Sequence, residues 1–248
     1  KSFIEIMSGS HVSTVKIRGE GADITEVCAR LSTKIEQVKS KISWVYGEYG
    51  ETTLMKIANR PLIRAAYPNI DNLEKYFEDF VKSSANVLIL IGPPGTGKTT
   101  FIRGLLNHCE LSATVTFESQ LLAKDSFFAD FISGKSNVLI MEDADVFLSA
   151  RVDGNTMMHK FLNMSDGLIS GIGKKIIFST NLPSIKSVDE ALIRPGRCFD
   201  VLEFGKLTTG EAAQVAAESG VEYNGGHTIA EIFAPINEHL KTKKGMGF

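Results

Sequence analysis

The residues between Asn86 and Leu105 carry a pattern suited to binding a triphosphate. Their sequence, NVLILIGPPGTGKTTFIRGL, fits the phosphate-loop pattern G-x-x-x-x-G-K-[ST] without a mismatch. The apolar run before the loop predicts a buried strand, and the loop should lead into a helix whose N-terminus faces the phosphates. The ammonium of Lys98 would reach the β- and γ-phosphates, and the Thr99 hydroxyl would be available to Mg²⁺. We expect the phosphates to be bound by Gly92, Pro93, Pro94, Gly95, Thr96, Gly97, Lys98, Thr99 and Thr100.

Two adjacent acids, Glu142 and Asp143, follow the apolar run VLIM about 45 residues after the phosphate loop. Open α/β sheets bind ligands at the carboxyl ends of their strands, so these acids should lie near the phosphates. One carboxylate would then hold Mg²⁺, and the next would orient the water that attacks the γ-phosphate. By position we assign Glu142, with Thr99, to the metal and Asp143 to the water. The alternative, a charged turn after a strand, is disfavoured by the preceding phosphate loop.

Three further polar residues are candidates for contacts with phosphate. Asn181 follows the apolar run KKIIFST, and its amide could hydrogen-bond the attacking water or a phosphate oxygen. Arg194 and Arg197 flank a Pro-Gly pair, a rigid turn that could deliver a guanidinium to phosphate. From the residues alone, Asn181 could be an ordinary turn residue and the arginines could be surface charges.

The elements that must position these residues alternate between strand and helix across residues 71–205. A helix that starts near Asp71 should lead directly into the strand before the phosphate loop. This alternation predicts an α/β fold, a phosphate-loop NTPase parallel sheet flanked by helices. The expected strands are 87–91, 113–117, 137–141, 175–179 and 200–204.

Residues 1–58 predict a small N-terminal α+β unit, which residues 59–70 link to the domain that follows. The pattern favours two short strands, a helix and a hairpin, at 2–7, 12–18, 24–38 and 42–57. We find no catalytic constellation there. Trp44, Tyr46 and Tyr49 could form a ligand platform, but aromatic residues at a two-residue period are more often one packed face of a sheet.

Residues 206–248 predict a short helical lid after the last strand. Thr208 and Glu211 form a capping box for one helix, and a second helix should start near Thr228.

The composition is that of an ordinary soluble globular chain, with 43% hydrophobic and 23% charged residues. A net charge of −2 gives no overall attraction to nucleic acid or to anionic membrane. The three cysteines are widely spaced and suggest neither a disulfide framework nor a metal site, which favours a cytoplasmic location. No apolar run approaches the roughly 20 residues of a membrane span. The chain begins at Lys1, so we expect that an upstream piece is missing.

Together these motifs resemble those of the AAA ATPases. In family order and at family spacing, the chain carries GPPGTGKT as Walker A, VLIMED as Walker B, IIFSTN ending at the first sensor, and DEALIRPGR as the second homology region. The segment HKFLNMSDGL at 159–168 resembles the family's helix before the fourth strand. The resemblance implies Mg²⁺ and ATP, a homo-oligomeric ring that we expect to be hexameric, and Asn181 as the sensor. It also implies that Arg194 and Arg197 act on the nucleotide of the neighbouring subunit.

The Glu-Asp order in Walker B and the LN-x-x-DG segment most resemble the branch that contains the mitochondrial complex III assembly ATPase. The lack of a membrane span and of an import signal favours a bacterial or phage-encoded member. Most AAA proteins have Asp before Glu. Threading members carry an aromatic pore-loop residue, for which Phe127 and Phe128 are the candidates here, although helical packing explains both better. The chain also has an additional residue, Cys198, after the second arginine. The short lid shows no clear second-sensor arginine.

From the sequence we expect a ring-forming ATPase that couples Mg-ATP hydrolysis to remodelling or translocation of a protein client. A nucleic-acid-linked loader or motor is an alternative, against which the net charge of −2 weighs mildly. A nucleotide-controlled assembly scaffold is another, and the complete catalytic set weighs against it.

Overall fold

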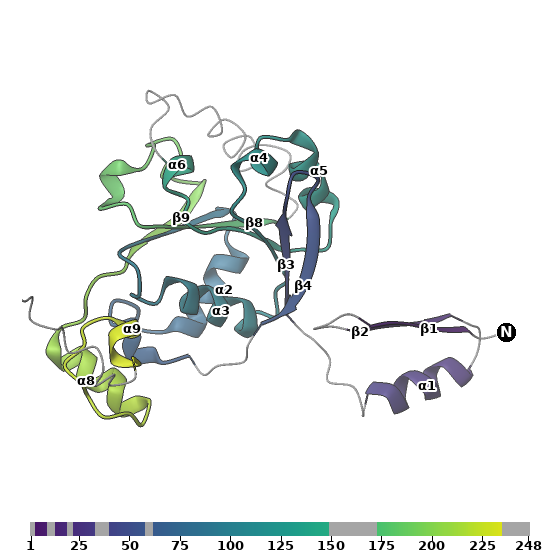
Figure 1. Ribbon diagram of the computed structural model, residues 1–248, viewed down its shortest axis with the longest axis horizontal. Coiled ribbons are helices and arrows are strands. Elements are labelled where there is room, and N and C mark those ends of the chain that lie inside the picture. The colour runs from purple at the N-terminus through teal and green to yellow at the C-terminus, as the bar shows by residue number, and fades with distance from the viewer. Residues whose placement is uncertain are drawn as a thin grey trace, which may run out of the picture.

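The computed structural model describes residues 3–8, 13–18, 22–32, 40–57, 62–148 and 173–234. Within these residues, a seven-stranded sheet has the order β4-β3-β6-β7-β8-β5-β9 (Figure 1). All neighbouring strands are parallel except β3 and β4, which form an antiparallel hairpin. The expected parallel sheet flanked by helices is confirmed. The strands are β3 Lys41–Tyr46, β4 Glu51–Lys56, β5 Val87–Ile91, β6 Ala113–Thr116, β7 Val138–Met141, β8 Lys175–Thr180 and β9 Cys198–Glu203.

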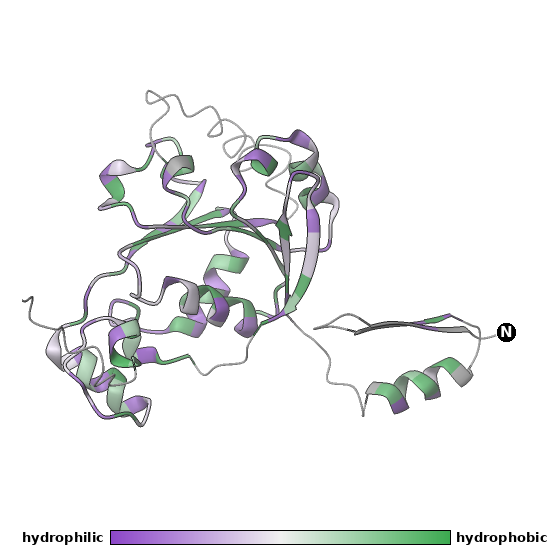
Figure 2. Ribbon diagram, viewed as in Figure 1, coloured by the Kyte–Doolittle hydropathy of each residue, from purple (hydrophilic) through white to green (hydrophobic). Residues whose placement is uncertain are grey.

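Helices cover both faces of this sheet (Figure 1). β5, β7 and β8 are buried along their whole lengths. β5 and β7 are therefore unbroken apolar runs, whereas β8 is apolar only between Lys175 and Ser179 (Figure 2). Among the described helices, none is long and apolar enough to cross a membrane. One face carries α2 Leu73–Lys82 and α3 Lys98–His108, and the other carries α4 Ser119–Leu122, α5 Asp125–Ser133 and α6 Asp145–Leu148.

The core beneath α2 and α3 is centred on the fully buried ring of Phe101. The rings of Tyr67, Phe77 and Phe204 lie 5.3, 5.1 and 5.7 Å from it, centroid to centroid, and all three meet it edge-on. Because Phe101 lies in the first turn of α3, this cluster fixes the helix that begins at the phosphate loop.

The N-terminal residues form a separate antiparallel pair, β1 Phe3–Ser8 and β2 Ser13–Arg18, followed by α1 Ala22–Ser32. Figure 1 shows these elements apart from the seven-stranded sheet. The sequence analysis placed the hairpin β3–β4 in the same N-terminal unit, residues 1–58. In the structure β3 pairs instead with β6 of the large sheet, with Ile42 opposite Ala113. That pairing joins segments about 70 residues apart in the chain, so local periodicity carries no sign of it.

The aromatic residues of the hairpin do not act as one group. Trp44 and Tyr46 pack against each other on one face of β3, with ring centroids 5.0 Å apart, as the packing interpretation expected. Tyr49 lies instead in the turn between the strands and is 87% exposed.

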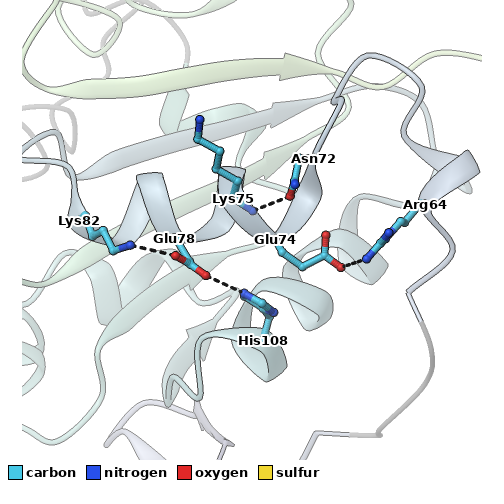
Figure 3. A network of polar contacts seen from close by, with 7 residues as sticks. All are labelled: Arg64, Asn72, Glu74, Lys75, Glu78, Lys82 and His108. Carbon is cyan, nitrogen blue, oxygen red and sulfur yellow. Dashed lines mark hydrogen bonds and ion pairs between the residues drawn. The ribbon is translucent and has the colours of Figure 1, made fainter.

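The start of α2 differs slightly from the expectation. Asn72, not Asp71, is the N-cap, because its side-chain oxygen accepts a hydrogen bond from the Lys75 amide at 2.8 Å (Figure 3).

Exposed charges tie α2 to its neighbours (Figure 3). Arg64 pairs with Glu74 at 2.5 Å, while Glu78 pairs with Lys82 at 2.8 Å and with the His108 ring at 3.5 Å. The hydrogen bond from Arg64 lowers the pKa of Glu74, and that from Lys82 lowers the pKa of Glu78. Solvent screens such pairs, so they orient the linker more than they stabilise the fold.

The lid packs against the linker that precedes α2. It consists of α8 Thr209–Glu218 and α9 Ile229–Ile232, and both begin with the expected capping residues, Thr208 and Thr228. The Glu218 carboxylate accepts a hydrogen bond from the Ala65 amide at 3.2 Å, which joins the end of α8 to a 3₁₀ turn at Arg64–Ala66.

A buried cation, Lys175, lies at the amino end of the parallel strands, where β8 begins. The Lys175 ammonium donates to Ser83 O at 2.6 Å and Ala85 O at 3.0 Å, and it lies 5.1 Å from the centre of the Phe80 ring. Burial lowers the pKa of Lys175 from 10.5 to about 8. The hydrogen bonds that hold the segment between α2 and β5 therefore depend on the protonation state of the buried Lys175 amine.

We expect Phe101→Ala to lower the free energy of unfolding by about 3–5 kcal/mol, because the cavity lies among rings that cannot collapse into it. Phe117, which is 46% exposed, provides the matched control, and Phe117→Ala should change that free energy by no more than about 0.5 kcal/mol. Urea denaturation followed by circular dichroism measures both. Equal losses in the two variants would contradict the central role of Phe101.

We expect Lys175→Met to change how stability depends on pH. Between about pH 8 and 10.5 the unfolded chain keeps the Lys175 proton that the folded chain has released, so the stability contributed at this position rises with pH. The unfolding free energy of the unmodified chain should therefore increase relative to Lys175→Met from about pH 7.5 to 9.5, in urea titrations. Replacement of the exposed Lys186 by Met should leave the dependence unchanged. Parallel pH profiles for the chain and Lys175→Met would disprove the effect.

Candidate active site

The phosphate loop joins the end of β5 to the start of α3, as the sequence predicted. Gly92, Gly95 and Gly97 all have positive φ, at 153°, 80° and 99°. A Cβ on Gly92 would lie 2.1 Å from the backbone oxygen of Phe204, and one on Gly95 would lie 2.9 Å from the Cβ of Ala230. Conformation and close packing therefore both require glycine here. The α3 N-terminus behind the loop supplies free amides for an anion.

The Lys98 side chain lies across the loop and is only 8% exposed. Its ammonium donates to Gly92 O at 2.5 Å, to Pro93 O at 3.1 Å and to Oδ1 of Asn181 at 3.0 Å. The charge is thus held by acceptors that follow two adjacent strands, β5 and β8.

The charges around Lys98 are mainly negative. Burial lowers the pKa of Lys98, and the carboxylates of Asp143, Asp145 and Glu142 oppose part of that lowering. One ammonium therefore faces three carboxylates. A divalent cation that accompanied a polyphosphate would offset this excess of negative charge.

Glu142 and Thr99 form a pair suited to Mg²⁺. The Thr99 hydroxyl donates to Oε1 of Glu142 at 2.8 Å, which brings the start of α3 to the end of β7. Hydroxyl and carboxylate oxygens suit this hard cation, which proteins commonly hold through one or two carboxylates together with substrate phosphates and water. Among the described residues, no group of three or more acidic, His or Cys side chains is placed to hold a metal ion by itself.

Asp143 occupies a strained turn immediately after Glu142. Its φ of 51° lies in the left-handed region, which only a small fraction of non-glycine residues adopt. The turn lets the Ala144 amide donate to Ser179 O on β8 at 2.9 Å. It also leaves Oδ1 of Asp143 to accept a hydrogen bond from Nδ2 of Asn181 at 3.1 Å. The Asn181 amide therefore bridges Lys98 and Asp143.

These residues surround a cavity of about 540 Å³ that is large enough for a small ligand. Loop and helix residues between Pro94 and Thr100 line it, together with Glu142, Asp143 and Asn181. Ile229 and Ala230 of α9 complete the lining, and the Ala230 amide donates to Gly95 O at 3.0 Å. A second hollow of about 1040 Å³ flanks the loop between the linker and the segment after β9.

The two arginines lie at the other end of the sheet. The carbonyl oxygen of Arg197 accepts hydrogen bonds from the amides of Asn86 and Val87, both at 3.0 Å, where β5 begins. The phosphate loop starts where β5 ends, about 16 Å away at the usual rise of a strand. Arg197 donates to Ala191 O at 2.8 Å, and Arg194 is exposed. The structure thus brings Lys98, Thr99, Glu142, Asp143 and Asn181 together but leaves Arg194 and Arg197 apart from them.

The pore-loop candidates are buried. Phe127 and Phe128 are 8% and 6% exposed, and their rings meet edge-on at 5.6 Å in the core beneath α4 and α5. The packing interpretation of these residues is therefore confirmed. The segment 159–168, which also resembled the family, lies outside the described residues.

Sequence reasoning missed three contributors to the site. Ile229 and Ala230 reach the loop through backbone contact and packing, which no motif signals. Tyr67, 5% exposed, donates from its hydroxyl to Gly97 O at 3.2 Å and so supports the end of the loop. The Asp145 carboxylate accepts a hydrogen bond from the backbone amide of Asn181 at 2.9 Å. The one sequence feature that could have identified Asp145 is its position two residues after Asp143.

Comparison with known proteins agrees with this geometry. Residues 88–206 match the model of the ATPase family associated with various cellular activities (AAA). The 26S proteasome regulatory subunit 8 of Caenorhabditis elegans is 31% identical over 136 residues, covering 47% of this chain and 32% of that protein. Its homolog in Saccharomyces cerevisiae is 28% identical over 156 residues, covering 56% and 38%. The regulatory subunit 7 homolog of Schizosaccharomyces pombe is 27% identical over 199 residues, covering 70% and 42%.

The chain thus aligns with less than half the length of each of these relatives. Residues 88–206, which match the family, hold the phosphate loop, both acids and Asn181 in one sheet of the expected topology. The chain therefore contains an AAA ATPase domain over residues 88–206, homologous to those of the proteasome regulatory subunits.

Proposed function

We propose that this chain hydrolyses ATP with Mg²⁺ as one subunit of a homo-oligomeric, hexameric ring, and that hydrolysis drives the remodelling or translocation of a protein client. The observation that supports hydrolysis most strongly is the convergence of Lys98, Thr99, Glu142, Asp143 and Asn181 on one cavity. Lys98 and Thr99 begin α3, which follows β5, while the two acids and Asn181 directly follow β7 and β8, and the three strands are adjacent in the sheet. A binding module without catalysis would need the loop but not the Asp143–Asn181 pair.

The triphosphate binds where the loop amides and the α3 N-terminus converge. Lys98 exchanges some of its present acceptors for oxygens of the β- and γ-phosphates. Thr99 and Glu142 would hold Mg²⁺, which supplies charge neutralisation to the phosphates. The larger hollow beside Gly92 and Thr96 leaves room for the nucleoside.

Asp143 orients the water that attacks the γ-phosphate, and its carboxylate accepts the proton of that water. The hydrogen bond from Nδ2 of Asn181 fixes the direction of this carboxylate, while Oδ1 of Asn181 remains on Lys98. The Thr99–Glu142 contact supports the division of roles in which Glu142 serves the metal and Asp143 the water.

Arg194 and Arg197 complete the site of a neighbouring subunit. Their turn is anchored at the amino end of β5, about 16 Å from the phosphate loop of the same chain. An arginine side chain cannot span that distance, which favours a role across an interface between copies. This placement supports the ring.

Two features support a protein client. Regulatory subunits of the 26S proteasome are among the proteins that this chain is similar to. The net charge of −2 provides no general attraction to nucleic acid, which remains the alternative client. Stimulation of ATP turnover by single- or double-stranded DNA at moderate salt would favour that alternative.

Within the AAA ATPases, we propose that this chain belongs to the branch that contains the complex III assembly ATPase, because it shares the Glu-Asp order of the two acids.

We expect Asp143→Asn to bind ATP normally but to turn it over about 10² to 10⁴ times more slowly, because the amide cannot accept the proton of the water. Asparagine tolerates the left-handed φ of this position, so the turn should persist. Glu142→Gln should instead raise the Mg²⁺ concentration needed for half-maximal activity. Nucleotide-binding fluorescence and phosphate release over a Mg²⁺ titration measure these effects. If the two phenotypes are exchanged, the two acids have the opposite roles.

We expect Arg197→Ala to bind ATP but to hydrolyse it poorly, since an arginine of this kind contributes roughly 10³ to 10⁵ in rate. Lys98→Ala should be inactive because it no longer binds the phosphates tightly. When the two variants are mixed, some interfaces pair an intact Lys98 site with an intact Arg197. ATP turnover, measured by phosphate release, should then partly recover.

A labelled-subunit exchange assay is the control for this mixing experiment. If the subunits exchange and no activity returns, the complementation across an interface is refuted. Specific activity of the unmodified chain should also rise with protein concentration, and a concentration-independent value would remove the ring from the mechanism.

A further inference from the structure

The carboxylate of Asp145 lies next to the site but has no role in the chemistry described above. Asp145 begins α6, and its Oδ1 accepts two hydrogen bonds from the end of β8. One comes from the Thr180 hydroxyl and the other, at 2.9 Å, from the backbone amide of Asn181. Asp145 itself lies outside the lining of the 540 Å³ cavity. Its bonds therefore act on the residue that lines the cavity and not on a ligand within it.

Thr180, the residue before Asn181, links this hydrogen-bonded group to the phosphate loop. Thr180 is fully buried, and its backbone oxygen accepts a hydrogen bond from the Gly92 amide at 3.2 Å. Its hydroxyl oxygen also accepts from the Leu182 amide at 3.1 Å, beyond Asn181. The backbone on both sides of Asn181 is thus held by hydrogen bonds to Gly92 and to the Thr180 hydroxyl. Asp145 accepts two more, from the Thr180 hydroxyl and from the backbone amide of Asn181 itself.

We propose that Asp145 is a positioning residue for ATP hydrolysis, which holds the Asn181 amide in the one orientation that bridges Lys98 and Asp143. This inference rests on the proposed function of the site. Asn181 can bridge the two side chains only if its Cα stays fixed, since the distances to both partners, 3.0 and 3.1 Å, allow little movement. Without Asp145, the backbone at Asn181 loses one acceptor and the buried Thr180 hydroxyl loses another.

The role requires an oxygen acceptor at this position and does not require a negative charge. The side-chain carbonyl oxygen of asparagine can accept the same two hydrogen bonds, so Asp145→Asn should preserve the position of Asn181. Alanine offers no acceptor. The contrast between these two variants separates positioning from an electrostatic effect of the carboxylate on Lys98.

The experiment measures kcat and KM for ATP in the full chain with Mg²⁺ for Asp145→Ala, Asp145→Asn, Asn181→Ala and the Asp145→Ala/Asn181→Ala double variant. Thermal unfolding confirms that each variant is folded. Asn181→Ala should lower kcat by about 10² to 10³, as for the loss of one oriented hydrogen-bonding group. Asp145→Ala should lower kcat by at least about tenfold with KM nearly unchanged, whereas Asp145→Asn should stay within about threefold of the unmodified chain.

The double variant provides the decisive comparison. If Asp145 acts through Asn181, removal of both side chains should cost no more than removal of Asn181 alone. The proposal would be overturned if the losses in kcat of the two single variants multiply in the double variant. It would also be overturned if Asp145→Asn lowers kcat as much as Asp145→Ala. A chain that hydrolyses ATP and is insensitive to Asp145→Ala would overturn it while leaving the proposed function intact. A chain without Mg-ATP hydrolysis would overturn both.

If Asp145→Ala does not fold, Thr180→Val tests the same contact from the other side. Valine matches threonine in shape but removes the hydroxyl, which donates to Asp145 and accepts from the Leu182 amide. It should lower kcat when Asn181 is present and have no further effect in the Asn181→Ala background. An equal loss in both backgrounds would overturn the proposal.

Discussion

The buried ammonium of Lys98 is the interaction on which the site depends. A charge with so little exposure needs acceptors, and it finds them on Gly92, Pro93 and Asn181. Those acceptors belong to the ends of two strands, so the charge fixes the relation between β5 and β8. The same amide that accepts from Lys98 donates to Asp143. One cation therefore organises both the phosphate-binding loop and the proposed catalytic carboxylate.

The order of the strands explains why this arrangement is possible. β8 lies between β5 and β7, so Asn181 emerges between the phosphate loop and the two acids. Parallel strands deliver all three ends to one edge. The same geometry sends the turn of Arg194 and Arg197 to the opposite edge, because that turn precedes β9 whereas the loop follows β5. This placement is the reason for our proposal that the two arginines act on another copy of the chain.

The elements outside the sheet hold the phosphate loop from both sides. Tyr67 of the linker contacts Gly97, and α9 of the lid contacts Gly95 through the Ala230 amide. The conformation of the phosphate loop therefore depends on contacts with segments that are far apart in the sequence.

The sequence by itself determined the chemistry and the local structure. The glycines, Lys98 and Thr99 predicted the loop, and the apolar runs predicted the strands. Glu142 and Asp143 were identified because they follow such a run, and Asn181 because its segment resembles the sensor of the AAA ATPases. These signals are local: spacing, periodicity and residue type over a few positions. Strand ends were predicted to within about two residues for the same reason.

Only the tertiary structure decided which of these residues meet. It joined the hairpin β3–β4 to β6, buried Phe127 and Phe128, separated the arginines from the loop, and added Asp145, Tyr67 and α9 to the site. Each of these depends on hydrogen bonds or packing between segments that are distant in the chain. Such contacts are set by how the whole sheet and its helices bury their apolar faces together, and no single stretch of sequence contains that information.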